Sequence, residues 1–403
     1  MKYCPPEYWI WLQNALGAGA NVSEILAYFE TPEELYLAGS KEWRLSGLLT
    51  EKRIEALRNT SPSQTAEVFK ECKNSGYTII TPQSELYPER LKNLSDMPLV
   101  IYGAGDCSVI NDRLSLGIVG TRNASDYGIQ IAQKLSYTLA KGGATIVSGG
   151  ALGIDSEAHA GAMLAKGRTM AFLGCGLSYK YLMENASLRK AITRYGALFS
   201  EYSPFSPPSK RSFPIRNRLI SGVSLGVIVI EAGVKSGSLI TASRALEQGK
   251  DVFAVPGDII RSSFDGANHL IKNGAKPVFK AEDVLCEYDY LYGEYINSEY
   301  LDLALSEIEY VDFRKKKSAK PTEREKVKEK PTEKTTQTKE NKIPEDVSED
   351  AIAVFKVLTE TPLHIDDIIR TTGMKMNTVL SALTELELEG TVEQVTGKKY
   401  KLM

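Results

Sequence analysis

The feature that most constrains the fold is an alternation of short apolar runs with amphipathic stretches between residues 113 and 285. The runs are almost continuously apolar, and the stretches between them repeat apolar residues at helical spacing. Strands that are buried on both faces have this composition, so the pattern predicts an α/β domain of Rossmann-like type with a mainly parallel sheet. The expected strands are 116–119, 144–148, 169–173, 225–230 and 251–255, and the expected helices are 127–141, 154–165, 186–194 and 239–248.

The charges of the chain are unevenly distributed. The whole chain has a formal net charge of −2, but residues 113–280 hold 21 Lys and Arg against 10 Asp and Glu, a net charge of +11. Residues 281–313 hold ten acidic residues and no Lys or Arg. A basic domain inside a nearly neutral chain is typical of a protein that binds a polyanion, although a merely basic surface would have the same composition.

Two segments precede this core. Residues 1–75 have apolar residues at helical spacing and predict a small helical module of the SAM or helix-hairpin-helix kind, with Thr31 as the N-cap of one helix and Pro32 in its first turn. Such a module either contacts a DNA backbone or, the plainer role, packs against the core and tethers the chain. Residues 76–112 are expected to connect the module to the core, with short strands at 77–80 and 99–102.

Two segments of contrasting charge follow the core. Residues 286–313 form an acidic, aromatic-rich extension. Residues 314–346 contain 12 Lys and Arg, 7 Asp and Glu, three prolines and no aromatic residue. This second composition cannot bury enough apolar area to offset the entropy of ordering, so it predicts a charged linker that adds only weak attraction to DNA.

The last segment, residues 347–403, is expected to be a separate winged-helix domain. Three helices are predicted at 349–358, 365–371 and 376–389, followed by a hairpin around Thr396-Gly397-Lys398. Winged helices often place the third helix in a DNA groove. Here glutamates would repel phosphate, so a structural or protein-binding role is favoured. The third helix carries Thr384, Glu385, Glu387 and Glu389, with Lys375 at its start.

Glycine-rich turns follow two of the expected strands, at the edge of the sheet where ligands bind in this kind of fold. The first turn offers backbone N–H groups at Gly120 and Thr121, a fork of donors at Arg122, and Ser125 or Asp126 as the cap of the next helix. The second turn, at Gly149 and Gly150, again opens a helix. An ordinary tight turn with a solvated arginine is the plain alternative for the first. Neither turn has the spacing of a Walker A loop or of a dinucleotide fingerprint.

Two further segments extend this pattern of anion donors. Between 210 and 218, basic residues surround Phe213, whose ring can stack on a base while the cations hold the backbone. Several prolines in and before this segment predict a loop rather than a central strand or helix, and a solvated charge run is the alternative. Candidate residues here are Lys210, Arg211, Phe213, Arg216, Asn217 and Arg218, and in the turn after strand 225–230 they are Ser236, Gly237 and Ser238.

The sequence shows donors without a catalytic constellation. The histidines have no visible Cys or Ser nucleophile as a partner, and no paired carboxylates suit general acid–base work. The five cysteines are scattered, so neither a disulfide framework nor a zinc site is expected. No apolar run is long enough to span a membrane, and no secretory signal is visible. We therefore expect a cytoplasmic binding protein without a cofactor, a metal or catalytic residues.

Six motifs in order, between about residues 91 and 285, resemble the signatures of the DprA/Smf family of DNA-processing proteins. The flanking helical module and winged helix also fit an architecture of that family. The motifs are Gly120-Thr121-Arg122 with Ser125, Tyr127 and Gly128; Ser148 to Asp155; Phe213 to Gly222; Glu231-Ala232 with Ser236 to Ala242; Phe253 to Gly257; and Asn268 to Ile271 with Gly274-Ala275.

This resemblance implies a homodimer that coats single-stranded DNA, helps to load the RecA recombinase and supports natural transformation, without catalytic turnover. It implies that Gly120 and Arg122 contact the DNA. It also adds the strand end at Leu173-Gly174-Cys175-Gly176-Leu177 to the pocket, with Lys180 as a phosphate contact. Family members usually have Tyr-Pro after this turn, whereas this chain has Tyr181-Leu182, which leaves the contacts of Lys180 and Asn185 open.

The rival interpretation is an enzyme. The core resembles, more distantly, Rossmann-like proteins that hydrolyse nucleoside monophosphates at the N-glycosidic bond. Those proteins carry a PGGxGTxxE turn with a catalytic glutamate, and the equivalent position here is Thr241. Without that carboxylate, no group is placed to stabilise the positive charge of the transition state, so binding is favoured over hydrolysis.

Overall fold

A computed structural model describes residues 2–180, 185–311, 348–359, 361–374, 376–388, 391–395 and 399–402. The expected linker at 314–346, the turn at Thr396-Gly397-Lys398, Tyr181-Leu182 and Lys375 lie outside these residues. The core and the C-terminal domain are separate compact units, divided after residue 316, and each is considered by itself.

A nine-stranded sheet forms the centre of the first unit, in the order β1-β2-β6-β5-β4-β3-β7-β8-β9. All neighbours from β6 to β9 are parallel, while β1 and β2 are antiparallel to their neighbours. The mainly parallel, Rossmann-like sheet predicted from the sequence is thus confirmed. The strands are β1 Thr78–Ile80, β2 Ile101–Gly105, β3 Ser115–Val119, β4 Thr145–Ser148, β5 Thr169–Leu173, β6 Gly196–Ser200, β7 Gly226–Val229, β8 Asp251–Ala254 and β9 Lys276–Pro277.

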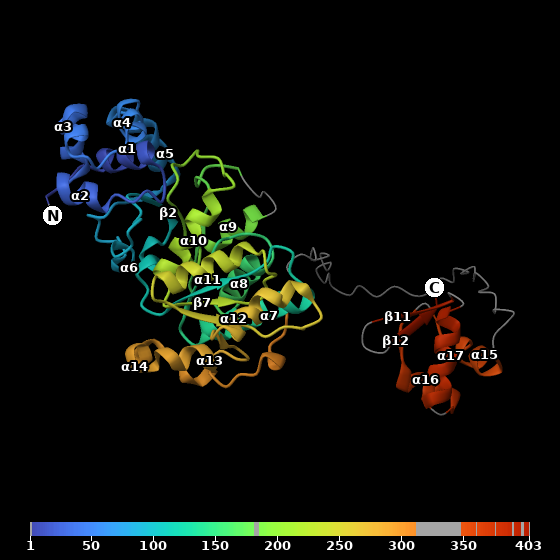
Figure 1. Cartoon of the computed structure of the whole chain (residues 1–403). Helices are drawn as coiled ribbons and strands as arrows, with labels where there is room; N and C mark the ends of the chain where they lie inside the picture. The colour runs from blue at the N-terminus through green and yellow to red at the C-terminus, as the bar shows by residue number, and fades with distance from the viewer. Residues whose placement is uncertain are drawn as a thin grey trace, which may run out of the picture. The chain divides into compact units, whose positions relative to one another are not determined.

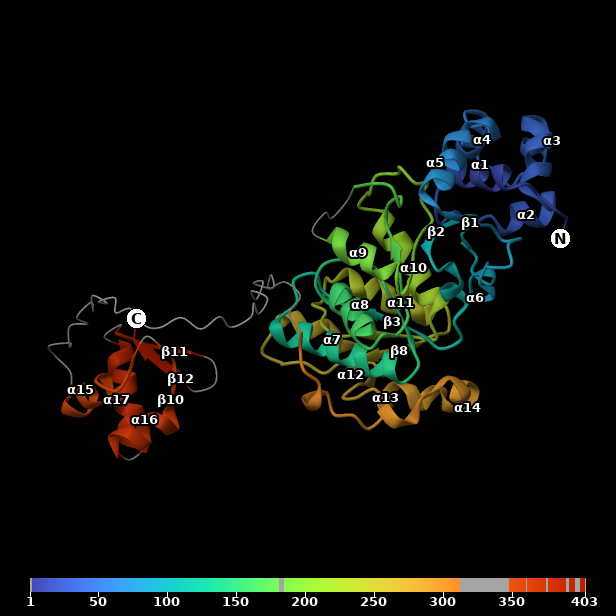
Figure 2. The same cartoon turned by 180° about the vertical axis from the view of Figure 1, so that it is seen from behind.

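Helices cover both faces of this sheet because alternate strand residues point to opposite sides. On one face, Val119 and Val227 pack with the helices that carry Leu219 and Ala242. On the other face, Ile118 and Ile228 pack with helices from the two glycine-rich turns. The first face is covered by α10 Ser212–Val223, α11 Gly237–Glu247 and α12 Asp265–Lys272, and the second by α7 Asp126–Lys141, α8 Ile154–Leu164 and α13 Glu282–Leu285. Figures 1 and 2 both show α10 and α11 side by side.

The N-terminal helices pack on the end of the sheet where β2 lies (Figures 1 and 2). The Gln13 side chain bonds to both backbone groups of Val100, and it also donates to the carbonyl oxygen of Glu201, which follows β6. Thr31 accepts a hydrogen bond from Glu34 N, which confirms its predicted capping role. These helices are α1 Pro6–Leu16, α2 Ser23–Phe29, α3 Pro32–Leu45, α4 Glu51–Arg58 and α5 Ala66–Ser75, and the unit also contains the short α6 Glu89–Lys92, α9 Ala186–Ile192 and α14 Asp289–Tyr292.

The acidic extension runs back along α7. The Gln133 side chain donates to the Val311 carbonyl at 3.0 Å and accepts from its N–H at 2.8 Å. Asn297 N donates to the carbonyl oxygen of Gly142 at the end of α7. The aliphatic and aromatic side chains of the acidic extension pack against the core on the face of the sheet that α7 covers.

The C-terminal unit is a winged helix, as predicted. It comprises α15 Glu349–Phe355, β10 Leu363–His364, α16 Ile365–Thr372, α17 Met376–Leu388, β11 Val392–Val395 and β12 Lys399–Leu402. Glu385, one of the glutamates on α17, accepts hydrogen bonds from Ser348 N and Oγ at the start of α15, and these bonds lower the pKa of its carboxyl. This glutamate therefore has a structural partner inside the domain. Within the described residues, no helix combines the length and apolar character needed to cross a bilayer.

Candidate functional site

The direction of the strand order reverses between β3 and β7, because the chain winds from β3 towards β6 and then returns to place β7 on the other side of β3. In open parallel sheets, the crevice at the carboxyl ends of such a pair is the usual ligand site. Here the two turns that follow these strands touch, since Thr121 N donates to Glu231 O at 2.7 Å. The switch point between β3 and β7 is therefore the expected ligand site of this fold.

A cavity of about 340 Å³ opens at this crevice, and we call it the strand-end pocket. Its wall combines the turn after β3, the start of α8, the first turns of α10 and the start of α11. The sequence separates these segments by up to about 120 residues, and the sheet brings them together. The lining residues are Val119, Gly120, Thr121, Arg122, Ala151, Asp155, Phe213, Pro214, Arg216, Asn217, Ile220, Ser236, Gly237, Ser238, Ile240 and Thr241.

The turn after β3 is fixed by a buried carboxylate. Glu231 accepts hydrogen bonds from Ser125 N and Ser125 Oγ, both at 2.9 Å. Ser125 Oγ in turn accepts from Gly128 N, so Ser125 is the N-cap of α7. A Cβ at Gly128 would lie 2.1 Å from the Glu231 carboxylate, which explains the glycine. Ser125 therefore organises the turn, and exposed Arg122 extends from it with its guanidinium 5.0 Å from the Phe213 ring centroid.

The second glycine-rich turn lies beneath the surface. Gly149 and Gly150 are both buried. Asp155 Oδ2 accepts from Gly149 N at 3.1 Å and from Ala151 N at 3.4 Å, so a carboxylate of the chain itself occupies these amides. Burial raises the pKa of the Asp155 carboxyl, and the nearby Arg216 opposes the rise. Ala151 and Asp155 of this segment line the strand-end pocket, whereas Gly149 and Gly150 lie behind them and do not present free N–H groups to it.

The expectation that residues 210–218 avoid a helix is wrong. Helix α10 begins at Ser212, and Pro214 occupies its first turn, where an N–H would have no partner inside the helix. Proline is therefore compatible with this position, and its presence does not predict a loop. Lys210 and Arg211 precede the helix and are exposed, and Phe213 is half-buried.

The three polar residues that follow are buried and bonded to the protein. Arg216 Nη1 donates to Gly149 O at 2.7 Å and also to Phe172 O, and its Nε donates to Asn217 Oδ1 at 3.1 Å. Asn217 Nδ2 donates to Gly237 O at 3.3 Å. Burial lowers the pKa of Arg216 and Asp155 opposes this. Arg216 and Asn217 therefore connect the wall segments of the pocket.

Arg218 has a place different from the DNA contact expected from its sequence position. Its Nη2 lies 2.7 and 2.8 Å from the two carboxylate oxygens of Glu201, and its Nε lies 3.2 Å from Asp96. The side chain is almost fully buried and does not line the strand-end pocket. The guanidinium therefore contacts carboxylates of the protein and is shielded from solvent.

The turn after β7 supplies the last wall. Ser236 is the N-cap of α11 and its Oγ accepts from Ser238 N at 3.4 Å. Gly237 is exposed, and nothing lies within 4 Å of the position a Cβ would take. Lys235, also exposed, adjoins Ser236 and was missing from the predicted set. The sequence could have indicated Lys235, because it is a cation directly before the donor turn. Arg211 has the same position directly before α10.

Lys180 and Asn185 also differ in burial, as the residues of the segment 210–218 do. Lys180 is exposed. Asn185 is buried and its Nδ2 donates to Gly150 O at 3.2 Å and to Ser156 Oγ at 3.1 Å. Asn185 therefore supports the second turn from below.

His159 lies in the middle of α8 and is fully buried. Thr169 Oγ1 donates to Ile146 O, so the His159 Nδ1–H donates to Thr169 Oγ1, at 2.7 Å. Burial, reinforced by Arg216, lowers the pKa of His159 to about 3. The ring is therefore neutral at physiological pH, and its role is to pack in the core.

The depressed pKa of His159 makes the core sensitive to acid. The unfolded chain, with an ordinary histidine pKa, binds more protons between pH 6.5 and 3, so the free energy of unfolding falls as pH falls. We expect the wild type to lose about 2 kcal/mol more than His159→Gln between pH 7 and pH 5. Urea unfolding followed by tryptophan fluorescence measures this difference, and equal losses in both proteins would contradict it.

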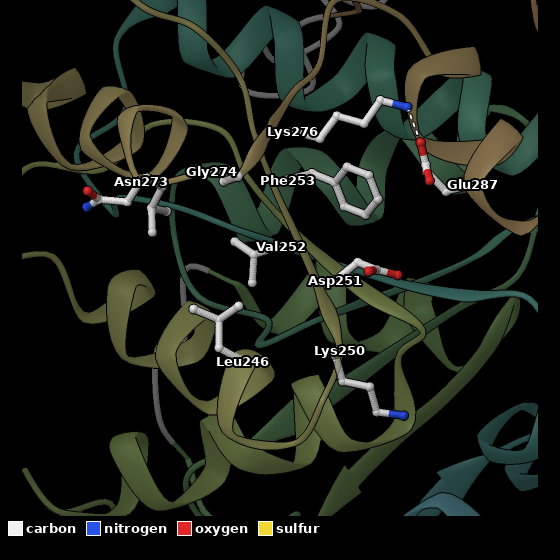
Figure 3. Close-up of a pocket in the computed structure, with 11 residues that line it drawn as sticks. Leu246, Lys250, Asp251, Val252, Phe253, Asn273, Gly274, Lys276 and Glu287 are labelled. Atoms are coloured by element: carbon white, nitrogen blue, oxygen red, sulfur yellow. Dashed lines mark hydrogen bonds and ion pairs between the residues drawn. The ribbon is translucent and has the colours of Figure 1, made fainter.

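A second cavity, of about 330 Å³, lies where β8 begins and β9 forms the edge of the sheet (Figure 3). Figure 3 shows Lys276 pointing toward Glu287, with which it forms an ion pair. Lys250 and Asp251 stand at the amino end of β8. This cavity lies at the amino ends of the strands, whereas the strand-end pocket lies at their carboxyl ends, at the switch point.

Comparison with known proteins gives one family. The family described as DNA recombination-mediator protein A matches residues 78–289, and the DprA winged helix domain matches residues 338–398. The DNA processing protein DprA of Bacillus subtilis is 43% identical over 53% of this chain and 72% of its own length. The protein Smf of Synechocystis is 32% identical over 98% of both chains. The X-ray structure of DNA processing protein A from Streptococcus pneumoniae has a TM-score of 0.62 and 33% identity, covering 71% of this chain and 99% of that one.

Proposed function

Because this chain belongs to the DprA/Smf family of DNA recombination mediators, we propose that it binds single-stranded DNA at the strand-end pocket. The observation that carries the proposal is the convergence of the turn after β3, the start of α10 and the start of α11 at the switch point of the sheet. Exposed cations flank these segments, at Arg122, Lys210, Arg211 and Lys235. A cationic rim around N–H and hydroxyl donors suits a phosphate backbone.

The burial of each residue divides the predicted set into two roles. Exposed cations and the accessible turns would contact phosphates, and Phe213 would contact a base. Buried residues would hold these groups in place. The proposed contacts are Gly120, Thr121, Arg122, Lys180, Lys210, Arg211, Phe213, Ser236 and Gly237, to which Lys235 is added, and the proposed supports are the buried Gly149, Gly150, Asn185, Arg216, Asn217, Arg218 and Ser238 with the half-buried cap Ser125.

Binding without turnover is the chemistry that this pocket supports best. Asp155 is the one carboxylate among the lining residues, and its Oδ2 is engaged by two backbone amides. Thr241, at the position expected for the glutamate of a nucleoside-monophosphate hydrolase, is buried in the wall. These contacts favour a binding protein over the hydrolase.

The membership of a recombination-mediator family supports a wider proposal. The chain would act in the cytoplasm as a homodimer formed through the core, would help to load the RecA recombinase onto the bound strand, and would support natural transformation. Coated DNA must remain accessible to a recombinase, so the strand would be held mainly through its backbone, as the cationic rim suggests.

Arg122→Ala tests the location of the site. A phosphate contact carries no sequence information, so we expect weaker binding of all single strands alike. Loss of one phosphate contact should reduce the slope of log affinity against log salt by about 0.7. Fluorescence anisotropy of a labelled oligo-dT at several salt concentrations measures both quantities.

Arg113→Ala is the matched control, because Arg113 is exposed just before the amino end of β3 whereas Arg122 follows its carboxyl end. We expect the control to retain wild-type affinity and slope. Equal slopes for Arg122→Ala and the wild type would remove Arg122 from the site. Equal binding of duplex and single strand by the wild type would overturn the proposed function.

A further inference from the structure

Selectivity for single strands requires contact with bases, because a duplex presents the same phosphates while its bases are stacked and paired. Phe213 is the one aromatic residue that lines the strand-end pocket. The Arg122 guanidinium already lies 5.0 Å from its ring centroid. One face of the ring is thus covered by a cation, and other apolar groups are needed to contact additional bases.

Three strongly exposed aliphatic residues stand at the same edge of the sheet. Ile259 and Ile260 are 86% and 89% exposed, and Val234 is 69% exposed. The two isoleucines follow the carboxyl end of β8, and Val234 follows that of β7. Adjacent branched side chains with so little burial gain nothing for the fold, and exposed apolar groups of this kind mark interaction sites.

The segment 256–263, which we call the isoleucine loop, contacts the start of α7 and the turn after β7. Tyr127, in the first turn of α7, donates from its hydroxyl to Pro256 O at 3.2 Å. A Cβ at Gly233 would lie 3.3 Å from Ser262 O. Hydrogen bonds from Gly266 N and Ala267 N to Ala232 O hold the chain after the loop against the turn after β7. The loop therefore contacts the turn after β7, whose later residues, Ser236 to Ser238, line the pocket.

The isoleucine loop is held in a definite conformation by Asp258. Asp258 Oδ1 accepts from Ile260 N at 2.9 Å, and Asp258 also pairs with Arg261 at 3.6 Å. The exposed Lys235 is next to Val234. The pair lies between Asp258 and its ion-pair partner Arg261, so it offers apolar contact to bases rather than charge to phosphates.

We propose that Ile259 and Ile260 contact unpaired bases of the DNA strand whose phosphates are bound at the strand-end pocket. The inference rests on the proposed function and adds the source of its selectivity for single strands. The occupant is the same strand, because the loop contacts the turn after β7, and that turn also carries the pocket-lining Ser236 and the rim cation Lys235.

The test compares two oligonucleotides of equal charge, a labelled 20-nucleotide oligo-dT and an abasic strand of the same length. The variant is Ile259→Ser/Ile260→Ser in the full chain. The matched control is Leu37→Ser/Leu45→Ser, which removes two exposed leucines, 70% and 68% exposed, from α3. All four side chains are exposed, so thermal unfolding should be unchanged in both variants.

We expect the isoleucine variant to bind oligo-dT about tenfold more weakly, near the lower end of the range for losing one base–aromatic stack, with an unchanged salt slope. Its affinity for the abasic strand should equal that of the wild type, and the control should bind both strands normally. Equal losses on both strands, no loss, or a changed molar mass in light scattering would overturn the inference, the last by showing that the pair contacts a second copy. A wild type that binds neither strand would refute the proposed function itself.

Discussion

Arg218→Met should destabilise the core by about 3–5 kcal/mol, because it leaves the buried Glu201 carboxylate without its partner. Arg218 donates to both oxygens of that carboxylate. Burial raises the pKa of Glu201, and Arg218 opposes this rise. In the variant the folded state therefore binds a proton more readily than the unfolded chain. The destabilisation should grow from pH 5 to pH 8, as measured by urea unfolding with tryptophan fluorescence.

Two further variants make the result specific. Arg244→Met removes an exposed pair with Glu247, which should change stability by less than about 1 kcal/mol. Arg218→Met/Glu201→Gln removes both buried charges and should recover part of the loss. If Arg218→Met costs no more than Arg244→Met, the buried pair is not a stabilising element. The salt slope of DNA binding should stay at the wild-type value, because Arg218 holds no phosphate in the proposed site.

Arg218 also shows where inference from the sequence ends. Four cations between 210 and 218 look alike in the sequence, yet two are exposed and two are buried. The difference depends on partners that the chain brings from elsewhere: Glu201 follows β6, Asp96 precedes β2, and Gly149 follows β4. Local pattern reports residue type, whereas burial of a charge is decided by tertiary neighbours.

The fold was more accessible than the site because strand and helix periodicity is local. The five strands expected in the core are all present, and the turns after β3 and β7 meet as the parallel order requires. The sequence did not reveal β6, whose short Gly-Ala-Leu-Phe-Ser run has no distinct boundary. It also did not reveal that β1 and β2 extend the same sheet, since strand pairing is set by long-range contacts.

Gly153→Ala should lower both the stability of the core and its affinity for single-stranded DNA. Gly153 has φ +76°, and a Cβ there would lie 2.4 Å from Thr121 O and 2.5 Å from Arg122 O. Both oxygens are backbone atoms of the turn after β3, so the clash cannot be relieved by rotation of a flexible side chain. We expect a loss of about 3 kcal/mol in the free energy of unfolding, at the upper end for a residue in a conformation reserved for glycine.

Gly249→Ala separates backbone strain from displacement of the turn. Gly249 has φ +67° and nothing within 4 Å of its Cβ position, so it should cost only about 1–2 kcal/mol. It lies before the amino end of β8 and should leave DNA binding unchanged. Gly153→Ala instead displaces Thr121 and Arg122, so its affinity in anisotropy should fall toward that of Arg122→Ala even under conditions where both variants are fully folded. Normal binding by folded Gly153→Ala would show that the position of this turn does not determine the site.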